Sequence, residues 1–307
     1  MLGMRRRMVL SIVLAAVLAG CGTSPTGEGD GPMVVATTSI WGDVARQVVG
    51  EAGSVEVLIP VGVDAHDYQP TQRQVARLQA ADLVVANGLG LEERLQDILE
   101  SAEADGANVL ELAPALEPIE FVHHDDDHGR GDLDPHVWFD PIRVGRAARL
   151  IAEQLAEVAP EIDWAARAGA YIAELEQLDG EIRDVLDDVP APNRMMVTNH
   201  EALGYFAERY DFEVIGVVIP GGSTLSDPSS AELAELVDEI VHEGVSTIFA
   251  ETSQPSRLAE AVAAEVGDEV SVVELYTESL GGQDSGAETL IEMLRTNAVS
   301  VADALSR

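Results

Sequence analysis

The sequence predicts an α/β protein of two βα lobes with parallel sheets, joined by one long linking helix. Its 307 residues, of which 46% are hydrophobic, exceed what one core of ordinary size holds. In both halves short β-branched runs alternate with helical patterns, which is typical of βαβ units and parallel sheets. The region between the halves has a helical pattern and no flexible hinge, so we expect one helix to connect the lobes.

The first half, residues 33–160, is predicted to form the N-terminal lobe. Its strands are expected at 34–38, 55–59, 83–86 and 109–112, and its helices at 41–49, 72–80 and 91–101. Thr71 and Gln74 have the spacing of a capping box, which marks the start of the second helix.

The connection between the lobes is predicted from residues 141–189, a helical region broken near Pro160. From 163 to 186 apolar residues recur at close to the helical period: Ala166, Ala170, Ala173, Leu175, Leu178, Ile182 and Val185. The linking helix is therefore expected within 161–189.

The second half, residues 190–307, is predicted to form the C-terminal lobe. Its strands are expected at 195–198, 214–219, 247–250 and 270–275, and its helices at 202–210, 229–243, 256–265 and 286–305. Pro228 after Asp227 suits a first helical position, and Ser285 with Glu288 has capping-box spacing.

The N-terminus has the pattern of an export signal. Arg5, Arg6 and Arg7 precede an apolar run at 9–19, which is shorter than the roughly 20 residues of a membrane span. The sequence LAGC ending at Cys21 resembles the lipobox of bacterial lipoproteins. The resemblance implies a signal peptide at 1–20, a lipid on Cys21 and an anchor on the extracytoplasmic face of the cell membrane. Residues 21–32 are then a flexible tether, and the export route stays open.

The charge of the chain excludes some classes of partner. Its net charge is −37, from 55 acidic against 18 basic residues, and every basic residue is Arg. Such a polyanion is repelled by nucleic acid and by anionic lipid, so neither is expected as a partner. An acidic composition more often reflects a general solubility bias, so it does not by itself predict cation binding.

Three histidines and one acid occupy similar places in the predicted fold. His66 and His200 follow strands of the first and second lobes, Glu278 follows the last strand, and His136 precedes a helix. Open α/β sheets bind ligands beyond the carboxyl ends of their strands. Imidazole suits zinc, a carboxylate balances part of the charge, and a helix N-terminus at His200 would keep that ring neutral. A single histidine at a strand end more often has a structural or surface role. Residues this far apart in the chain carry no local spacing signal, so their positions alone are weak evidence for a metal site.

Four segments extend this pattern. GVDAHDYQPT at 62–71, DPHVWFDP at 134–141 and VTNHEALGYF at 197–206 resemble the ligand motifs of the zinc- and manganese-binding solute-binding proteins of metal ABC transporters. YTESL at 276–280 is similar to the fourth motif, in which the family usually has Asp instead of Glu278. The resemblance implies a metal between two lobes, with His66, His136 and His200 as ligands. Either Glu278 or a water completes the shell.

A second histidine cluster precedes His136. His123, His124 and His128, in HHDDDH, resemble the His-rich acidic loop of zinc-specific family members. Two interpretations stay open: a loop that concentrates zinc weakly, and a solvated loop with no role. His242 is interpreted as a surface residue near the end of a helix.

The resemblance implies a function. We expect a monomeric, non-enzymatic component of an ABC importer that captures Zn²⁺ outside the cytoplasm and delivers it to the permease and its ATPase. A third imidazole, His200, stands where manganese-specific relatives often carry Glu, which favours zinc over the alternative, Mn²⁺. Adhesion to host surfaces is ascribed to some relatives, and nothing in the sequence tests it.

Two other classes of function are considered. Three histidines with an open fourth position would form a zinc hydrolase site, but the chain has no HExxH or GxSxG motif. A siderophore or corrinoid binder shares the single-helix bridge, but aromatic residues are only 4% of this chain and the histidine motifs would be unexplained.

Overall fold

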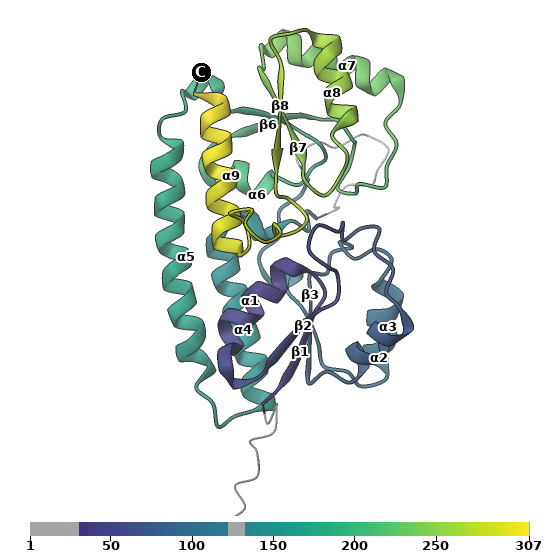
Figure 1. Ribbon diagram of the computed structural model, residues 1–307, viewed down its shortest axis with the longest axis vertical. Coiled ribbons are helices and arrows are strands. Elements are labelled where there is room, and N and C mark those ends of the chain that lie inside the picture. Colours follow the sequence, from purple (N-terminus) through teal and green to yellow (C-terminus); the bar gives the residue numbers. More distant parts are fainter. Residues whose placement is uncertain (1–30, 122–132, 307) are drawn as a thin grey trace, which may run out of the picture.

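The computed structural model describes residues 31–121 and 133–306 and consists of two α/β lobes stacked along one long helix (Figure 1). The predicted signal peptide, Cys21, most of the tether, and the histidines at 123, 124 and 128 lie outside the described residues. Within the described ranges, no helix is both long and apolar enough to cross a membrane.

The N-terminal lobe is built on a four-stranded parallel sheet of order β2-β1-β3-β4. Its elements are β1 (Met33–Ala36), α1 (Ser39–Val49), β2 (Ser54–Val57), α2 (Gln72–Gln79), β3 (Leu83–Ala86), α3 (Gln96–Ala104) and β4 (Val109–Glu111). Val34 on the central strand β1 pairs with Val55 of β2 and Leu83 of β3. Helix α1 covers one face of this sheet, while α2 and α3 lie on its other side (Figure 1).

The C-terminal lobe repeats this topology with the strand order β6-β5-β7-β8, again all parallel. Its elements are β5 (Met195–Thr198), α6 (Gly204–Tyr210), β6 (Glu213–Val217), α7 (Ser230–Glu243), β7 (Thr247–Glu251), α8 (Arg257–Val266) and β8 (Ser271–Leu275). A small apolar cluster, which includes Val197, Ile240 and Ile248, fills the space between this sheet and helices α7 and α8.

Two long helices and the last helix hold the lobes together. Helix α4 (Pro141–Val158) packs against α5 (Trp164–Leu186), and α5 runs past both lobes (Figure 1). At 23 residues and 1.5 Å of rise per residue, α5 spans about 35 Å. Helix α9 (Leu290–Leu305) returns from the C-terminal lobe and packs against α5 and α1. The predicted fold class is therefore confirmed.

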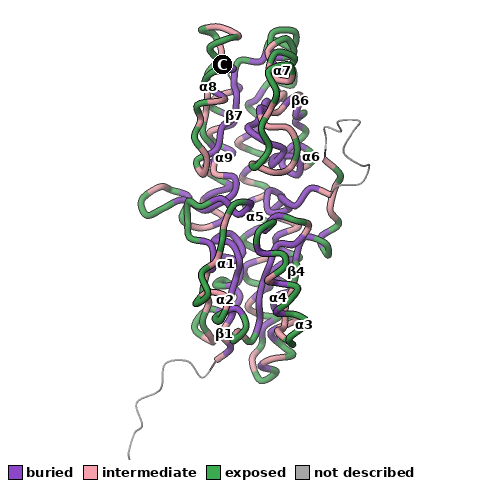
Figure 2. Tube along the Cα trace, turned by 90° about the vertical axis from the view of Figure 1, so that its right-hand side faces the viewer, coloured by how far each residue is buried: buried purple, intermediate pink, exposed green. Residues whose placement is uncertain are grey.

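The apolar residues of α5 explain its position. Ala168, Tyr171, Leu175, Leu178 and Ile182 are buried and recur every three or four residues, so they form one stripe along the helix. They belong to a continuous apolar core that includes residues of both lobes. Buried segments accordingly run through each lobe and through the level at which the lobes meet (Figure 2).

Several local predictions are wrong, and each has a local cause. Helix α7 is capped by Ser229 rather than begun by Pro228, because the Ser229 side chain and Glu232 satisfy each other's backbone N–H groups. The corresponding box before α9 is Thr289 with Glu292, not Ser285 with Glu288. The predicted box of Thr71 with Gln74 is confirmed.

Helix α3 starts at Gln96, later than predicted, because Glu92 holds the preceding segment in turns. The buried Glu92 carboxylate accepts hydrogen bonds from the backbone N–H groups of Asn87 and Gly88, and from the Thr37 hydroxyl at 2.5 Å. Leu91 and Leu95 are buried in the same segment. The segment between β3 and α3 is thereby fixed against the carboxyl end of β3.

Candidate metal centre

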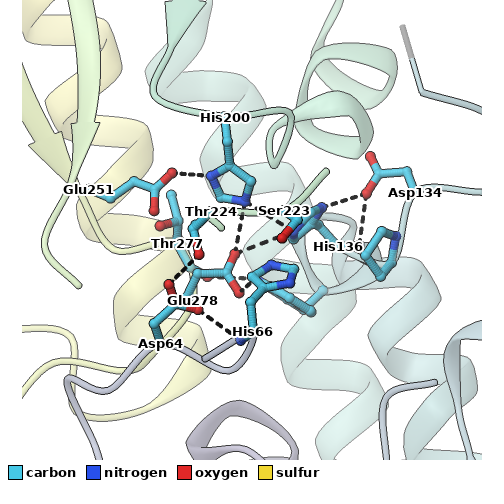
Figure 3. A network of polar contacts seen from close by, with 12 residues as sticks. Asp64, His66, Asp134, His136, His200, Ser223, Thr224, Glu251, Thr277 and Glu278 are labelled. Carbon is cyan, nitrogen blue, oxygen red and sulfur yellow. Dashed lines mark hydrogen bonds and ion pairs between the residues drawn. The ribbon is translucent and has the colours of Figure 1, made fainter. Parts of the chain in front are cut away.

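Four predicted site residues meet in the cleft between the lobes. His66, His136, His200 and Glu278 are all buried, and one ligand atom from each lies within 4.8 Å of all the others. They come from the loop after β2, the residue just before the 3₁₀ turn Val137–Phe139 that precedes α4, the loop after β5 and the loop after β8. Figure 3 shows the side chains pointing toward one another from both lobes. The sheets' carboxyl ends therefore face a common centre, as predicted.

The Nε2 atoms of the three rings converge on the Glu278 carboxylate. Oε1 of Glu278 lies 3.4 Å from His136 Nε2 and 3.5 Å from His200 Nε2, and Oε2 lies 3.7 Å from His66 Nε2. The Nε2 atoms of His136 and His200 are 3.2 Å apart. Three imidazole nitrogens and a carboxylate at such separations are a donor set that suits a tetrahedral divalent cation.

A second carboxylate stands behind each imidazole. Asp134 Oδ1 lies 2.7 Å from His136 Nδ1, Glu251 Oε1 contacts His200 Nδ1, and Glu93 Oε1 lies 3.5 Å from His66 Nδ1. Carboxylates at Nδ1 favour the tautomer that leaves Nε2 free for a metal, and they raise the basicity of the ring. We call Glu93, Asp134 and Glu251 the supporting carboxylates.

None of the supporting carboxylates is among the site residues predicted from the sequence. Two of them, Asp134 and Glu251, stand at positions in the sequence from which the role could have been predicted. Asp134 stands two residues before His136, and Glu251 is the last residue of β7, at the same sheet edge as His200. Glu93 carries no such signal, since it lies in the turns before α3 and meets His66 only through packing.

The loops that carry His66 and His136 use the same local turn. Asp64 Oδ1 accepts the backbone N–H of His66, and Asp134 Oδ1 accepts that of His136, each at 2.8 Å. An aspartate that accepts a hydrogen bond two residues on closes an Asx turn. This turn explains the DxH spacing of both segments and sets the direction in which each ring leaves the backbone.

Gly204, the first residue of α6, is required by the same arrangement. A Cβ atom there would lie 2.7 Å from Asp134 Oδ2, so a side chain would displace the carboxylate behind His136. The hydroxyl of the next residue, Tyr205, donates to the Asp134 backbone carbonyl at 2.6 Å. Helix α6 of the C-terminal lobe thus holds the His136 loop of the N-terminal lobe.

Several buried polar atoms at the centre lack partners. Both ring nitrogens of His66 and both carboxylate oxygens of Glu278 have no hydrogen-bond partner among residues 31–121 and 133–306. A buried carboxylate without hydrogen bonds costs free energy unless a cation neutralises it. The fold therefore leaves the His66 and Glu278 atoms that would bind a metal without protein partners.

The charges of the site shift its histidines in opposite directions. Burial lowers the pKa of His136 well below its ordinary value. Burial also opposes protonation of His200, but the charges of Glu251 and Glu278 outweigh it and raise the pKa of His200 well above the ordinary value. The expectation of a neutral His200 is therefore wrong for the metal-free protein. Helix α6 begins only at Gly204, so its N-terminus does not act on the ring.

A solvent-accessible cavity reaches the metal centre on the side of His66. A cavity of about 440 Å³ opens beside His66 and is lined by residues that include Glu93, Pro135 and Ser223. The other three site residues are not among those that line it. His242, which the sequence predicts at the surface, has a side chain that is 79% exposed and lies away from this region on α7.

Comparison with known proteins places this geometry in a family. The model of the ZnuA family, described as zinc-uptake complex component A, periplasmic, matches residues 34–304. The chain belongs to this family. It is 32% identical to the manganese-binding lipoprotein MntA of Bacillus subtilis, over 98% of this chain and all of that protein. It is 28% identical to the zinc-binding protein TroA of Treponema pallidum, over 99% of each.

The solved structures agree with this assignment. The structure of the periplasmic zinc-binding protein TroA from Treponema pallidum superposes with a TM-score of 0.81 at 29% identity, covering 90% of this chain and 100% of that one. The predicted resemblance and the predicted class of function, a metal-binding component of an ABC importer, are thus confirmed. This ZnuA-family protein is similar in fold to a protein named for zinc binding, and similar in sequence to proteins named for zinc and for manganese.

Proposed function

We propose that this ZnuA-family protein captures Zn²⁺ in the cleft between its lobes, through His66, His136, His200 and Glu278, and delivers it to a membrane permease. One observation carries the proposal: three Nε2 atoms and an otherwise unpartnered carboxylate converge within 4.8 Å in a buried place. An ATPase partner of the permease would drive import. The protein itself binds and releases the ion without chemical turnover.

Zinc is proposed as the cargo because three of the four ligands are imidazoles, which suit zinc better than manganese. Manganese is the alternative, since MntA of Bacillus subtilis is named for it. A nitrogen-rich site binds zinc more tightly whatever its physiological cargo, so affinity in solution does not separate the two. Elemental analysis of protein from its own host, with growth rescue of a deletion strain by each metal, separates them.

Glu278 is proposed as the fourth ligand rather than a water. Its carboxylate reaches the centre despite the extra methylene, with both oxygens within 3.7 Å of imidazole nitrogens. This also disfavours the hydrolase alternative, which needs an open fourth position for a reactive water.

We further propose a lipid anchor at Cys21 on the extracytoplasmic face of the cell membrane, and action as a monomer. The relative MntA is named a lipoprotein, which supports the anchor. The proposed division of the chain is the N-terminal lobe at 33–160, the linking helix at 161–189 and the C-terminal lobe at 190–307. Residues 123–128 are proposed at most to concentrate zinc.

The test removes one ligand at a time. His66→Ala or His200→Ala should abolish stoichiometric zinc binding and the rise in melting temperature that zinc produces. His242→Ala is the matched control, because it removes an exposed imidazole. An unchanged thermal shift in the ligand variants would refute the site. Deletion of residues 123–128 should leave tight zinc binding intact. Loss of tight binding in this deletion variant would mean that the site lies in that segment.

A further inference from the structure

We propose that Glu93 and His66 form an entry subsite, at which a partly hydrated divalent cation is held before it moves into the buried centre. The inference rests on the proposed function, since it concerns the route by which the captured ion arrives and leaves. It assigns a role in transfer to Glu93, which lies outside the four ligands.

The route is indicated by the cavity that reaches one of the four ligands, His66. His66 lines the cavity of about 440 Å³, together with Glu93. The rings of His136 and His200 are 0% exposed, and the Glu278 side chain is equally enclosed. An ion that enters through this cavity therefore meets Glu93 and His66 first and the other three ligands afterwards.

Glu93 differs from the other supporting carboxylates in its exposure. Its side chain is 39% exposed, whereas those of Asp134 and Glu251 are 1% and 2% exposed. The buried pair can act only on the rings behind which they stand. Glu93 can contact water on one side and His66 on the other, so it is able to exchange a water of the incoming ion for a carboxylate oxygen.

Glu93 also lies where the two lobes meet at the cavity. It belongs to the turns before α3 in the N-terminal lobe, and it lines the cavity together with Ser223 from the loop after β6 in the C-terminal lobe. A negative charge at this opening attracts a dication toward the cavity.

His66 is held less firmly than the other rings. Its two nitrogens are buried without a hydrogen-bond partner in the described parts of the chain, with Nδ1 directed at Glu93 and Nε2 at Glu278. The His136 ring is fixed by a 2.7 Å contact from Asp134, and Glu251 contacts His200. The His66 imidazole thus faces Glu93 at the cavity on one side and Glu278 in the buried centre on the other. A ligand that transfers an ion from the cavity to the centre needs this position.

The experiment measures the rates of zinc association and release by stopped-flow fluorescence of the full mature protein. The Trp138 indole lies 5.3 Å from the His136 ring and reports on the buried centre. Glu93→Gln, which keeps the size but removes the charge, is compared with Glu93→Asp and with the control Glu100→Gln. Glu100 is an exposed carboxylate on α3 in the same lobe.

A group that contacts the ion chiefly during passage lowers the barrier in both directions. We therefore expect Glu93→Gln to slow association about tenfold and to slow release as well, with a smaller change in the equilibrium constant. Glu93→Asp should retain much of the association rate, and Glu100→Gln should behave as wild type.

Three results would overturn the entry subsite. Faster release with unchanged association would mean that Glu93 only orients His66, and unchanged rates would mean that it has no role. Equal slowing by Glu100→Gln would mean that net charge alone attracts the ion. Equilibrium zinc titration of wild type and His136→Ala tests the proposed function separately from the entry subsite. Equal zinc affinity of the two proteins would refute capture in the cleft.

Discussion

Asp64 in the N-terminal lobe accepts a hydrogen bond across the cleft from the hydroxyl of Thr224 in the C-terminal lobe, at 2.5 Å. The same oxygen, Oδ2, accepts from Gln254 Nε2 at 2.5 Å, while Oδ1 accepts the backbone N–H of His66. One carboxylate therefore connects two loops of the opposite lobe and orients a metal ligand. The position of His66 is thereby coupled to the approach of the two lobes.

The Asp64→Asn substitution should weaken this connection without changing side-chain volume. The new amide places N–H donors where Oδ2 accepts two hydrogen bonds. The N–H groups of the new amide and of the Gln254 amide would then face each other, and neither could accept a hydrogen bond. We expect zinc affinity to fall about tenfold, as for other groups that orient ligands. Hydrogen exchange should increase in the loops at Thr224 and Gln254. Unchanged exchange in both loops would show that the lobes do not depend on this contact.

Glu251 should matter for affinity although it does not point at the metal centre. Glu251→Gln keeps an acceptor for His200 Nδ1–H but removes the charge that makes the ring basic. We expect a loss of affinity of about 10- to 100-fold, measured by competition with a chromophoric chelator. Glu243→Gln, at an exposed position at the end of α7, is the control. Wild-type affinity in Glu251→Gln would contradict the role of a supporting carboxylate.

Zinc binding should release a proton at neutral pH. Despite burial, Glu251 and Glu278 raise the pKa of His200 well above its ordinary value, so this ring is protonated in the metal-free protein. Zinc requires the neutral ring and displaces about one proton. Affinity should therefore rise with pH until the raised pKa is passed, and fall as the pH falls below it. Calorimetry in buffers of different ionisation enthalpy counts the proton, and a buffer-independent heat would contradict this prediction.

Glu278 should be a ligand in its own right. Glu278→Gln removes the only charge among the four ligand side chains when the rings are neutral, so the dication is no longer partly neutralised. We expect affinity to fall by more than about 100-fold, beyond the range for groups behind the ligands. Glu274→Gln removes an exposed charge from β8 and serves as the control. A small loss in Glu278→Gln would assign the fourth position to water.

Removal of the Tyr171 hydroxyl should stabilise the fold. Tyr171 on α5 is 3% exposed, and its hydroxyl has no hydrogen-bond partner in the described ranges. Because an unsatisfied buried hydroxyl costs free energy, Tyr171→Phe should raise the free energy of unfolding by about 1 kcal/mol. Urea denaturation of the metal-free protein measures it.

Tyr205→Phe is the matched comparison and should have the opposite sign. The Tyr205 hydroxyl donates to the Asp134 carbonyl and accepts from the Ile119 N–H, so its removal leaves two backbone groups without their partner. A loss of about 1–3 kcal/mol is expected. Equal changes in the free energy of unfolding would contradict the difference between an unpartnered Tyr171 hydroxyl and a hydrogen-bonded Tyr205 hydroxyl.

Local patterns were sufficient for the alternation of elements. Buried parallel strands such as Leu83–Ala86 and Met195–Thr198 have the predicted bounds because their β-branched residues are confined between turn residues. The start of α3 was predicted too early, because the Glu92 carboxylate competes for backbone N–H groups, which the apolar pattern does not reveal.

The sequence by itself determined the two-lobe fold, the family and the three histidine loops, because each depends on periodicity or on a short motif. Only the tertiary structure decided that Glu278 reaches the three rings, that Glu251 and Glu93 stand behind two of them, and that Asp64 joins the lobes. These relationships connect residues far apart in the chain. Their distances are set by how sheets and helices pack, which no local pattern of residues encodes.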